Sequence, residues 1–400
     1  MLSLEEAQAA IIDGMAVATE TETVDLAQAH RRYVAGEVAA RVDNPAFDNS
    51  AMDGYAVNSA QLLAAGFRLP LVGESSAGDA PGRLSPDTTM RIFTGAPLPV
   101  GADAVVIQED IKTEGETIVF PHTVQPGQNI RTLGQDFQYG DLLYGPGRRV
   151  SAFDVALLAA AGAAEVPVYR RPRVLVIATG DELAPPGAIL KPGQIYESNR
   201  QATLLLASHL GAEAIDGGTV RDDPDAVRDV LKNSMDYDFI ITSGGVSVGD
   251  YDLVKQVFAE IGDINFWKVR IKPGKPVAFG RLGKHCNFFG LPGNPVSSLV
   301  TFFLFVRPAL IAWHHGSTTP LVLSASATSD YRRHAGRTEF LRARLESDHG
   351  SLTVTPLPGQ GSHMLGTLRE TNALIRLEHD IEGFAAGDKL SVLPLSTEIS

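Results

Sequence analysis

One stretch of the chain combines a glycine turn with carboxylates. Residues 240–244 read as a buried strand that runs into a turn, and a helix is expected to follow to about Gly262. Glycines let backbone N–H groups face one concavity, and a helix N-terminus adds partial positive charge there. The pattern therefore predicts a phosphate cradle. Its glycines and serines are Ser243, Gly244, Gly245, Ser247 and Gly249.

Two acids, Asp250 and Asp252, close this stretch. They would repel a bare phosphate, so the pattern favours a divalent cation between the carboxylates and the phosphate. Hard oxygen ligands of this kind suit Mg²⁺. A tight strand–helix connection with solvated acids remains an alternative interpretation of these residues alone.

Polar clusters also follow three other predicted elements. The apolar strand at residues 174–178 ends in Thr179, Gly180, Asp181 and Glu182. Because the carboxyl ends of parallel strands meet at one edge of a sheet, we expect these clusters to converge. Acids for a cation, with lysines and helix ends for anions, predict a site for phosphoryl or nucleotidyl chemistry. The other two clusters are the cations Lys268, Arg270, Lys272 and Lys275, and the turn Leu291, Pro292, Gly293, Asn294 and Pro295.

Three common nucleotide-binding and hydrolase signatures are not supported by the sequence. It contains no G-x-x-x-x-G-K-[ST], which excludes a P-loop NTPase. No G-x-G-x-x-G follows the first α/β strand, which argues against a dinucleotide dehydrogenase. G-x-S-x-G occurs once, at residues 245–249, but neither its Ser247 nor Ser243 has an evident His partner, so the pattern does not indicate a hydrolase nucleophile elbow.

Composition narrows the class of protein further. The 400 residues exceed one ordinary core and predict two to four domains. A net charge of −13 argues against nucleic-acid binding, and the single Cys286 excludes an intramolecular disulfide framework. The N-terminus is acidic, and the most apolar run, residues 299–306, is too short to span a bilayer. We expect a cytoplasmic protein without a membrane partner.

Hydrophobic periodicity divides the chain into four regions. Helices are expected at residues 3–17, 26–40 and 151–162, and short β-type runs lie between the last two. Strand–helix alternation from residue 173 predicts a mostly parallel sheet covered on both faces, with helices at 199–210, after Pro224 and from Asn294 toward Trp313. The predicted domains are a discontinuous helical frame (1–45 and 139–171), an inserted β domain (46–138), an α/β domain (172–317) and a C-terminal β domain (318–400).

Seven motifs, running in order from Asp48 to Ser297, resemble those of the molybdopterin molybdenumtransferases, the molybdate insertases of molybdenum-cofactor biosynthesis. They are similar also to the C-terminal part of gephyrin. The resemblance covers essentially the whole chain. The motifs lie at residues 48–56, 94–97, 127–131, 179–183, 243–249, 272–276 and 291–297.

The resemblance implies a fold and a reaction. The fold is a multidomain α/β plus β chain with four domains, of which the central one resembles molybdopterin-binding domains and the last is a β barrel. The assembly is an elongated homodimer. The reaction joins molybdate to adenylylated molybdopterin with the help of Mg²⁺ and releases AMP and molybdenum cofactor.

The resemblance also implies roles for residues. It places the cation on Glu182 and Asp252, and it brings Asp53 and Asp136 toward the site from the β domain. The residues implied in catalysis are Asp53, Asp136, Glu182, Asp222, Asp252, Lys268 and Lys272. Those implied in binding the pterin and nucleotide are Thr179, Gly180, Asp181, Ser243, Gly244, Gly245, Ser247, Gly249, Lys275, Pro292, Gly293, Asn294, Arg342 and Ser362.

Two alternatives remain open. A molybdopterin adenylyltransferase, which makes the activated intermediate, resembles the α/β part, but the other domains argue against it. It is instead an expected partner that hands over the adenylylated substrate. A scaffold that has lost the chemistry is the second alternative, against which the retained Glu182, Asp252 and lysines speak. The sequence leaves open which paralogue this is and whether molybdate or tungstate is preferred.

Overall fold

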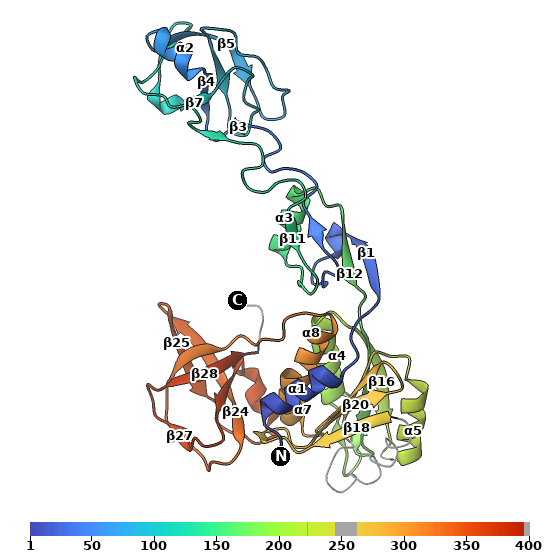
Figure 1. Cartoon of the computed structure of the whole chain (residues 1–400). Coiled ribbons are helices and arrows are strands. Elements are labelled where there is room, and N and C mark those ends of the chain that lie inside the picture. Colours follow the sequence, from blue (N-terminus) through green and yellow to red (C-terminus); the bar gives the residue numbers. More distant parts are fainter. Residues whose placement is uncertain (222, 245–261, 396–400) are drawn as a thin grey trace.

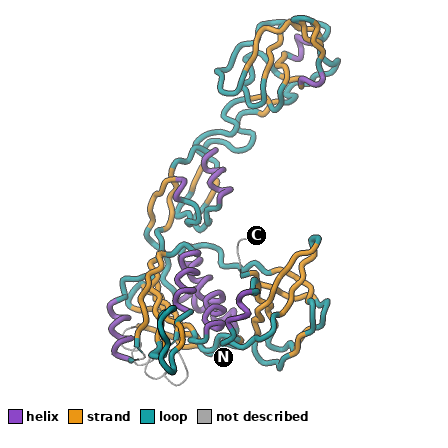
Figure 2. The backbone as a smooth tube through the Cα atoms, turned by 180° about the vertical axis from the view of Figure 1, so that it is seen from behind, coloured by secondary structure: helices purple, strands orange, loops and turns teal. Residues whose placement is uncertain are grey.

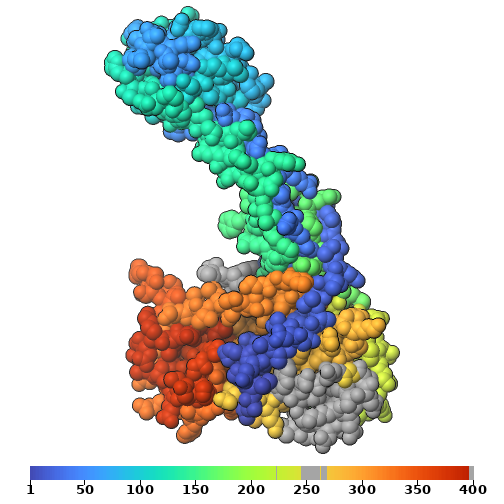
Figure 3. Space-filling view, in the orientation of Figure 1, coloured from blue at the N-terminus to red at the C-terminus, as the bar shows by residue number. Residues whose placement is uncertain are grey.

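The chain forms an elongated molecule with a broad base, a narrow neck and a separate head (Figures 1 and 3). The computed structural model describes residues 1–221, 223–244 and 262–395. The α/β part and the C-terminal β part lie side by side in the base, the frame forms the neck, and the inserted β domain is the head. Most of the helical segments lie in the base (Figure 2).

The α/β part is built on one six-stranded sheet, mostly parallel as predicted. Its strand order is β16-β13-β17-β21-β20-β18, in which the first four strands pair in parallel and β20 pairs antiparallel with both β21 and β18. Strand β16 was not predicted. The strands are β13 (Arg173–Thr179), β16 (Glu213–Val220), β17 (Phe239–Ser243), β18 (Gly262–Trp267), β20 (Val277–Leu282) and β21 (Cys286–Leu291), with the short pair β14 (Leu183–Ala184) and β15 (Ile195–Tyr196) beside them.

Helices cover this sheet where the periodicity predicts them. Helix α4 (Asn199–His209) and helix α5 (Pro224–Asn233) follow strands, and Asp223 caps α5 through the backbone N–H of Asp225. Helix α1 (Leu4–Gly14) starts with a capping box between Ser3 and Glu6 and packs its buried face on the same core.

A long apolar helix runs through the base from Pro295 to Trp313. It consists of α7 (Pro295–Thr301), a π-helical turn (Phe302–Val306) and α8 (Arg307–Trp313). Its 19 residues, with a mean hydropathy of 1.7, are long and apolar enough to span a membrane, but two thirds of its most apolar stretch is buried inside the structure. In this fold it is a core helix that packs against the sheet.

The frame is assembled from two separate chain segments, but it is less helical than expected. The helix predicted at residues 26–40 is wrong. Backbone N–H groups of Arg31, Val34 and Ala35 donate instead to carbonyls near residues 148–167, so long-range partners override local helix preference. The frame contains β1 (Thr21–Asp25), a 3₁₀ turn (Leu26–Gln28), β2 (Val38–Ala39), β11 (Leu142–Tyr144), the predicted α3 (Ala152–Ala160) and β12 (Glu165–Tyr169).

The inserted β domain has its own sheet and its own apolar cores. The strand order is β7-β4-β6-β5-β9-β8, and β3 pairs with β10 at the end nearer the frame. Its elements are β3 (Asn49–Ser50), β4 (Gly54–Val57), α2 (Ser59–Ala64), β5 (Arg68–Ser75), β6 (Thr89–Ile92), β7 (Ala104–Ile107), a 3₁₀ turn (Gln108–Asp110), β8 (Lys112–Glu114), β9 (Thr117–Val119) and β10 (Ile130–Arg131).

The C-terminal part is a closed β barrel, as the resemblance implied. The order β24-β25-β22-β28-β26 closes through direct pairing of β24 with β26. A short strand of the α/β part, β19 (Ile271–Lys272), pairs in parallel with β24 and so joins the two parts. The barrel elements are β22 (Leu323–Ala327), β23 (Tyr331–Arg332), β24 (Thr338–Asp348), β25 (Ser351–Pro356), a 3₁₀ turn (Leu365–Arg369), β26 (Ala373–Leu377), β27 (Gly383–Phe384) and β28 (Lys389–Pro394).

Candidate active site

A polar cavity of about 570 Å³ lies at the carboxyl ends of the parallel strands. It meets the expectation that the strand-end clusters converge, because β13, β17 and β21 all deliver residues to it. The sequence-predicted residues that line it are Thr179, Glu182, Ser243, Gly244, Lys275, Pro292, Gly293 and Asn294.

Glycines in two of the strand-end turns lie in close contact with neighbouring atoms. Gly244 has a φ of +97°, and a Cβ placed on it would lie 2.6 Å from the carbonyl oxygen of Thr179. A Cβ on Gly180 would lie 2.5 Å from Oε2 of Glu182, so the carboxylate of Glu182 folds back over Gly180. The glycines thus bring two turns into contact and set the carboxylate at the wall of the cavity.

Two helices point their N-termini at this cavity. Ser198, the N-cap of α4, and Asn294, the N-cap of α7, both line it, and neither side chain caps its own helix. Helix N-termini leave backbone N–H groups without intrahelical partners and carry partial positive charge. The arrangement suits the phosphate groups of a ligand.

Glu197 and Asn199 are among the cavity-wall residues that sequence reasoning missed. Glu197 is 3% exposed, and its Oε1 accepts a hydrogen bond of 2.7 Å from the backbone N–H of Arg200. Asn199 donates to Ser243 and to the Gly293 carbonyl. In the sequence, the only signal was a Ser-Asn pair before an apolar helix, which also reads as an ordinary cap.

Two buried oxygens beside this cavity form no hydrogen bond with the described residues, although Oε2 of Glu197 lies 3.7 Å from Nε of Arg200 in an ion pair. Within the described part of the chain, Thr179 Oγ1 and Glu197 Oε2 accept or donate no hydrogen bond, and both residues line the cavity. Buried polar atoms without partners are costly, and they occur where a ligand or water completes them. The wall is therefore polar, charged and incompletely satisfied without a ligand.

The barrel contributes a loop to the same cavity. His363 and Leu365 line it, and the carbonyl oxygen of Ser362 accepts a hydrogen bond of 3.1 Å from the backbone N–H of Val296 in α7. Arg342, a predicted binding residue, is 1% exposed and does not line this cavity. Its guanidinium donates to the carbonyls of Gly359, Gly361 and Met364, so it holds the loop that carries Ser362.

The predicted cations differ in their surroundings. Lys275 lines the cavity, whereas Lys268 is exposed and stands outside its wall. Lys272 forms an ion pair of 2.7 Å with Glu339 of the barrel. Asp181 is exposed beside Glu182.

Two predicted catalytic acids lie in the head of the molecule, far from this cavity (Figure 1). Asp53 precedes β4 and accepts hydrogen bonds of 2.8 Å from the backbone N–H and the hydroxyl of Thr94, which lower the pKa of its carboxyl. Asp136 accepts a hydrogen bond of 3.0 Å from Nδ2 of Asn44. A single chain thus holds the predicted catalytic residues in two separate places.

Several predicted residues lie outside the described residues, and so does the helix expected after Asp250. They are Asp222, Gly245, Ser247, Gly249 and Asp252. In the ranges that are described, no group of three or more His, Cys, Asp or Glu side chains could hold a metal ion. Glu182 is the predicted cation ligand that the structure places in the cavity wall.

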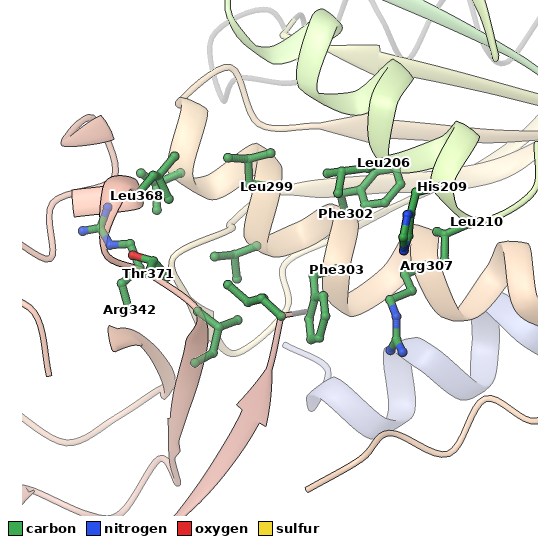
Figure 4. A pocket seen from close by; sticks show the side chains of 14 residues that line it. Leu206, His209, Leu210, Leu299, Phe302, Phe303, Arg307, Arg342, Leu368 and Thr371 are labelled. Carbon is green, nitrogen blue, oxygen red and sulfur yellow. The ribbon is translucent and has the colours of Figure 1, made fainter. Parts of the chain in front are cut away.

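A second cavity, of about 390 Å³, has a different character. It lies between α4, the 295–313 helix and the barrel, and Figure 4 shows leucine and phenylalanine side chains along most of it. Arg307 and Arg342 line it too, and burial lowers the pKa of both guanidinium groups. An apolar cavity of this kind offers little to a phosphate, so the polar cavity is the candidate active site.

Family comparisons agree with this architecture along nearly the whole chain. Residues 2–162 match the MoeA N-terminal region (domain I and II), residues 175–312 match a probable molybdopterin binding domain, and residues 324–395 match the MoeA C-terminal region (domain IV). The chain therefore belongs to the MoeA family of molybdopterin molybdenumtransferases.

Individual proteins support the same assignment. The molybdopterin molybdenumtransferase of Haemophilus influenzae is 39% identical over 99% of both chains. That of Nostoc sp. is 40% identical over 94% of this chain and 89% of its own. A crystal structure of the molybdopterin biosynthesis MoeA protein from Pyrococcus horikoshii covers all of both chains with a TM-score of 0.82 and 30% identity.

Proposed function

We propose that this protein inserts molybdate into adenylylated molybdopterin and releases AMP and molybdenum cofactor. The observation that carries the proposal is the polar cavity, where Glu182, Lys275 and the N-termini of α4 and α7 meet. Membership of the family supports it, because curated relatives are named molybdopterin molybdenumtransferase. The substrate is an anion with a phosphate and a nucleotide, and this wall offers cationic and N–H contacts to such groups.

The residues of the cavity suit the departure of AMP. Negative charge develops on the phosphate oxygens as the adenylyl linkage breaks, and preorganised donors stabilise such charge. Lys275 and the N-termini at Ser198 and Asn294 supply those donors in the proposal. Leu183, Ile195 and Tyr196 also line the cavity and offer apolar contact for a planar ring.

We assign Mg²⁺ to Glu182, with Asp252 as the second carboxylate. Mg²⁺ usually takes one or two protein carboxylates and completes its shell with waters and substrate phosphates. The carboxylate of Glu182 fits such a site because it lies at the cavity wall against Gly180. When bound, the cation would neutralise phosphate charge.

We further propose a homodimer whose active sites are shared. The separation of Asp53 and Asp136 from the cavity supports this, because the head of a second chain can bring them there. The substrate would arrive from a molybdopterin adenylyltransferase, the class of enzyme whose product is adenylylated molybdopterin. We also propose a cytoplasmic location, without nucleic-acid or membrane partners.

The proposal is tested by incubating the purified protein with adenylylated molybdopterin, molybdate and Mg²⁺ and measuring AMP. Wild type should release AMP, and Glu182→Gln should release it at least about tenfold more slowly at limiting Mg²⁺. Glu116→Gln, a change of an exposed carboxylate in the β domain, is the control and should behave as wild type. Equal rates for Glu182→Gln and wild type at every Mg²⁺ concentration would remove the cation assignment, and no AMP from wild type would remove the function.

A further inference from the structure

One side chain connects two of the elements that surround the polar cavity. Asn199, the first residue of α4, is 9% exposed. Its Nδ2 donates a hydrogen bond of 2.8 Å to Oγ of Ser243, at the end of β17, and another of 2.8 Å to the carbonyl oxygen of Gly293, after β21. A single amide therefore spans the glycine turn and the turn that begins the helix at Asn294.

The orientation of this amide follows from chemistry. The carbonyl oxygen of Gly293 can only accept a hydrogen bond, so the NH₂ group of Asn199 must face it. Oδ1 of Asn199 is then left for the hydroxyl of Ser198, at 3.4 Å. A carboxylate of the same shape, as in Asn199→Asp, would set an oxygen against the Gly293 carbonyl and would lose both donated bonds.

The two turns that Asn199 connects are also in direct contact. A Cβ on Gly293 would lie 3.6 Å from Cα of Gly244, and the backbone N–H of Gly244 donates to the carbonyl of Leu291 at 3.1 Å. Because both turns contain glycines, few side-chain contacts fix the distance between them. The buried amide of Asn199, which hydrogen-bonds to both turns, fixes that distance.

Asn199 is itself held in place by the start of α4. Oε1 of Glu197 accepts the backbone N–H of Arg200, and Arg200 forms an ion pair with Asp216 of β16. These contacts hold the start of α4, and with it the Asn199 side chain, in a fixed position, as a positioning residue requires.

We propose that Asn199 is a positioning residue that sets the spacing between the Ser243 turn and the helix N-terminus at Asn294. With the spacing held, both elements contact the phosphate groups of one nucleotide-bearing ligand at once. This role rests on the proposed function for the identity of the ligand. The spacing itself is a property of the unliganded protein.

The test compares Asn199→Ala and Asn199→Asp with a matched control, Asn287→Ala. Asn287 is also buried in this sheet, and its amide makes two hydrogen bonds, of 2.9 and 3.0 Å, with the backbone of Ala16. It lies near the start of β21, whereas the cavity lies at the end of that strand. All three variants should lose stability. A loss of activity confined to the Asn199 variants would therefore report positioning and not stability.

In the AMP-release assay, both Asn199 variants should show kcat/KM for adenylylated molybdopterin lower by about tenfold or more, per folded protein. Asn287→Ala should stay within about twofold of wild type. Hydrogen exchange without substrate should rise in segments 239–244 and 286–294 in the Asn199 variants. Values of kcat/KM within twofold of wild type in both Asn199 variants would overturn the proposal.

The exchange measurement keeps the two proposals separate. If wild type releases no AMP, the proposed function fails, and hydrogen exchange alone then decides the role of Asn199. Unchanged exchange at the 239–244 segment in both Asn199 variants, relative to Asn287→Ala, would overturn the positioning role whatever the activity.

Discussion

Nζ of Lys272 lies 2.7 Å from Oε1 of Glu339, whose side chain is 2% exposed. The two residues are register partners of β19 and β24, so backbone pairing sets them side by side. Arg333 is a second cation near this carboxylate, with Nη1 3.6 Å from Oε2 of Glu339. A lysine expected to meet substrate oxygens is thus also the partner of a buried carboxylate that joins the α/β part to the barrel.

This pair changes what a charge reversal at Lys272 should do. On the sequence alone, reversal of charge at Lys268 or Lys272 is expected to weaken anion binding more than it lowers stability. Lys272→Glu would instead place two carboxylates together at a domain junction, and we expect a loss of about 2–4 kcal/mol in the free energy of unfolding. Chemical denaturation measures it.

Lys268→Glu is the comparison for that experiment. Lys268 is exposed, so reversal there should leave the free energy of unfolding within about 0.5 kcal/mol of wild type and raise the molybdate concentration needed for half-maximal rate. Equal stability of the two variants would show that the Glu339 pair contributes nothing to folding.

The contact between neighbouring turns predicts a difference between two glycines. Gly244→Ala must place a Cβ 2.6 Å from the Thr179 carbonyl, whereas Gly187, also at positive φ (+87°), has nothing within 4 Å. Both alanines strain the backbone, but only the first also collides. We expect Gly244→Ala to lower kcat/KM by at least about tenfold and Gly187→Ala to lose at most about 1–2 kcal/mol of stability with near-normal activity.

Steady-state kinetics with thermal unfolding on both proteins checks this. If Gly187→Ala loses as much activity as Gly244→Ala, backbone strain rather than the turn contact explains the effect.

Burial of His314 at the junction of the neck and the base predicts a pH dependence. Its ring stacks on Tyr33 with centroids 4.4 Å apart, and burial lowers the pKa of His314 to about 4. The charged groups that face it, Arg32 and Arg149, act in the same direction, and the hydrogen bond to the Leu310 carbonyl opposes them.

The unfolded chain takes up this proton below about pH 6.5, whereas the folded chain stays neutral until the pH approaches 4. Between those values the unfolded state binds more protons, so stability falls as the pH falls, by up to about 1.4 kcal/mol per pH unit. Unfolding free energies from pH 7 to pH 4 should show a smaller slope in His314→Asn than in wild type. The exposed His334→Asn should keep the wild-type slope, and an unchanged slope in His314→Asn would contradict the assignment.

The shared site predicts recovery of activity between two inactive variants. Asp53→Ala and Asp252→Ala damage different parts of the site, so a heterodimer of the two holds one intact site if each site uses both chains. Random exchange at a 1:1 ratio should then restore roughly a quarter of wild-type activity. Absence of recovery, with subunit exchange verified and each parent inactive, would place the whole site within one chain.

Short sequence patterns correctly predicted those elements of the fold that neighbouring residues stabilise. The capping box at Ser3, the proline start of α5 and the apolar strand at residues 174–178 all appear where expected, because each pattern stabilises its own element. The helix expected at residues 26–40 fails because its backbone pairs with chain more than a hundred residues away. A prediction made from residues 26–40 alone cannot include such partners, because they lie at residues 148–167.

The candidate site divides in the same way. Strand-end residues such as Thr179 and Ser243 could be predicted, because sheet topology brings strand ends together. The bridge from Asn199 to Gly293 could not, because it joins residues 94 positions apart through one amide. The partner of Lys272 could not be predicted either, because the pairing of the short strand β19 with β24 sets Lys272 against Glu339.

The most direct test of the central claim is the ratio of molybdenum inserted to AMP released. Wild-type protein, adenylylated molybdopterin and Mg²⁺ would be mixed with and without molybdate, with AMP quantified by chromatography and pterin-bound molybdenum by elemental analysis. The account predicts equal amounts of both products with molybdate and little AMP without it. AMP release that is the same without molybdate, or a pterin product free of molybdenum, would contradict it.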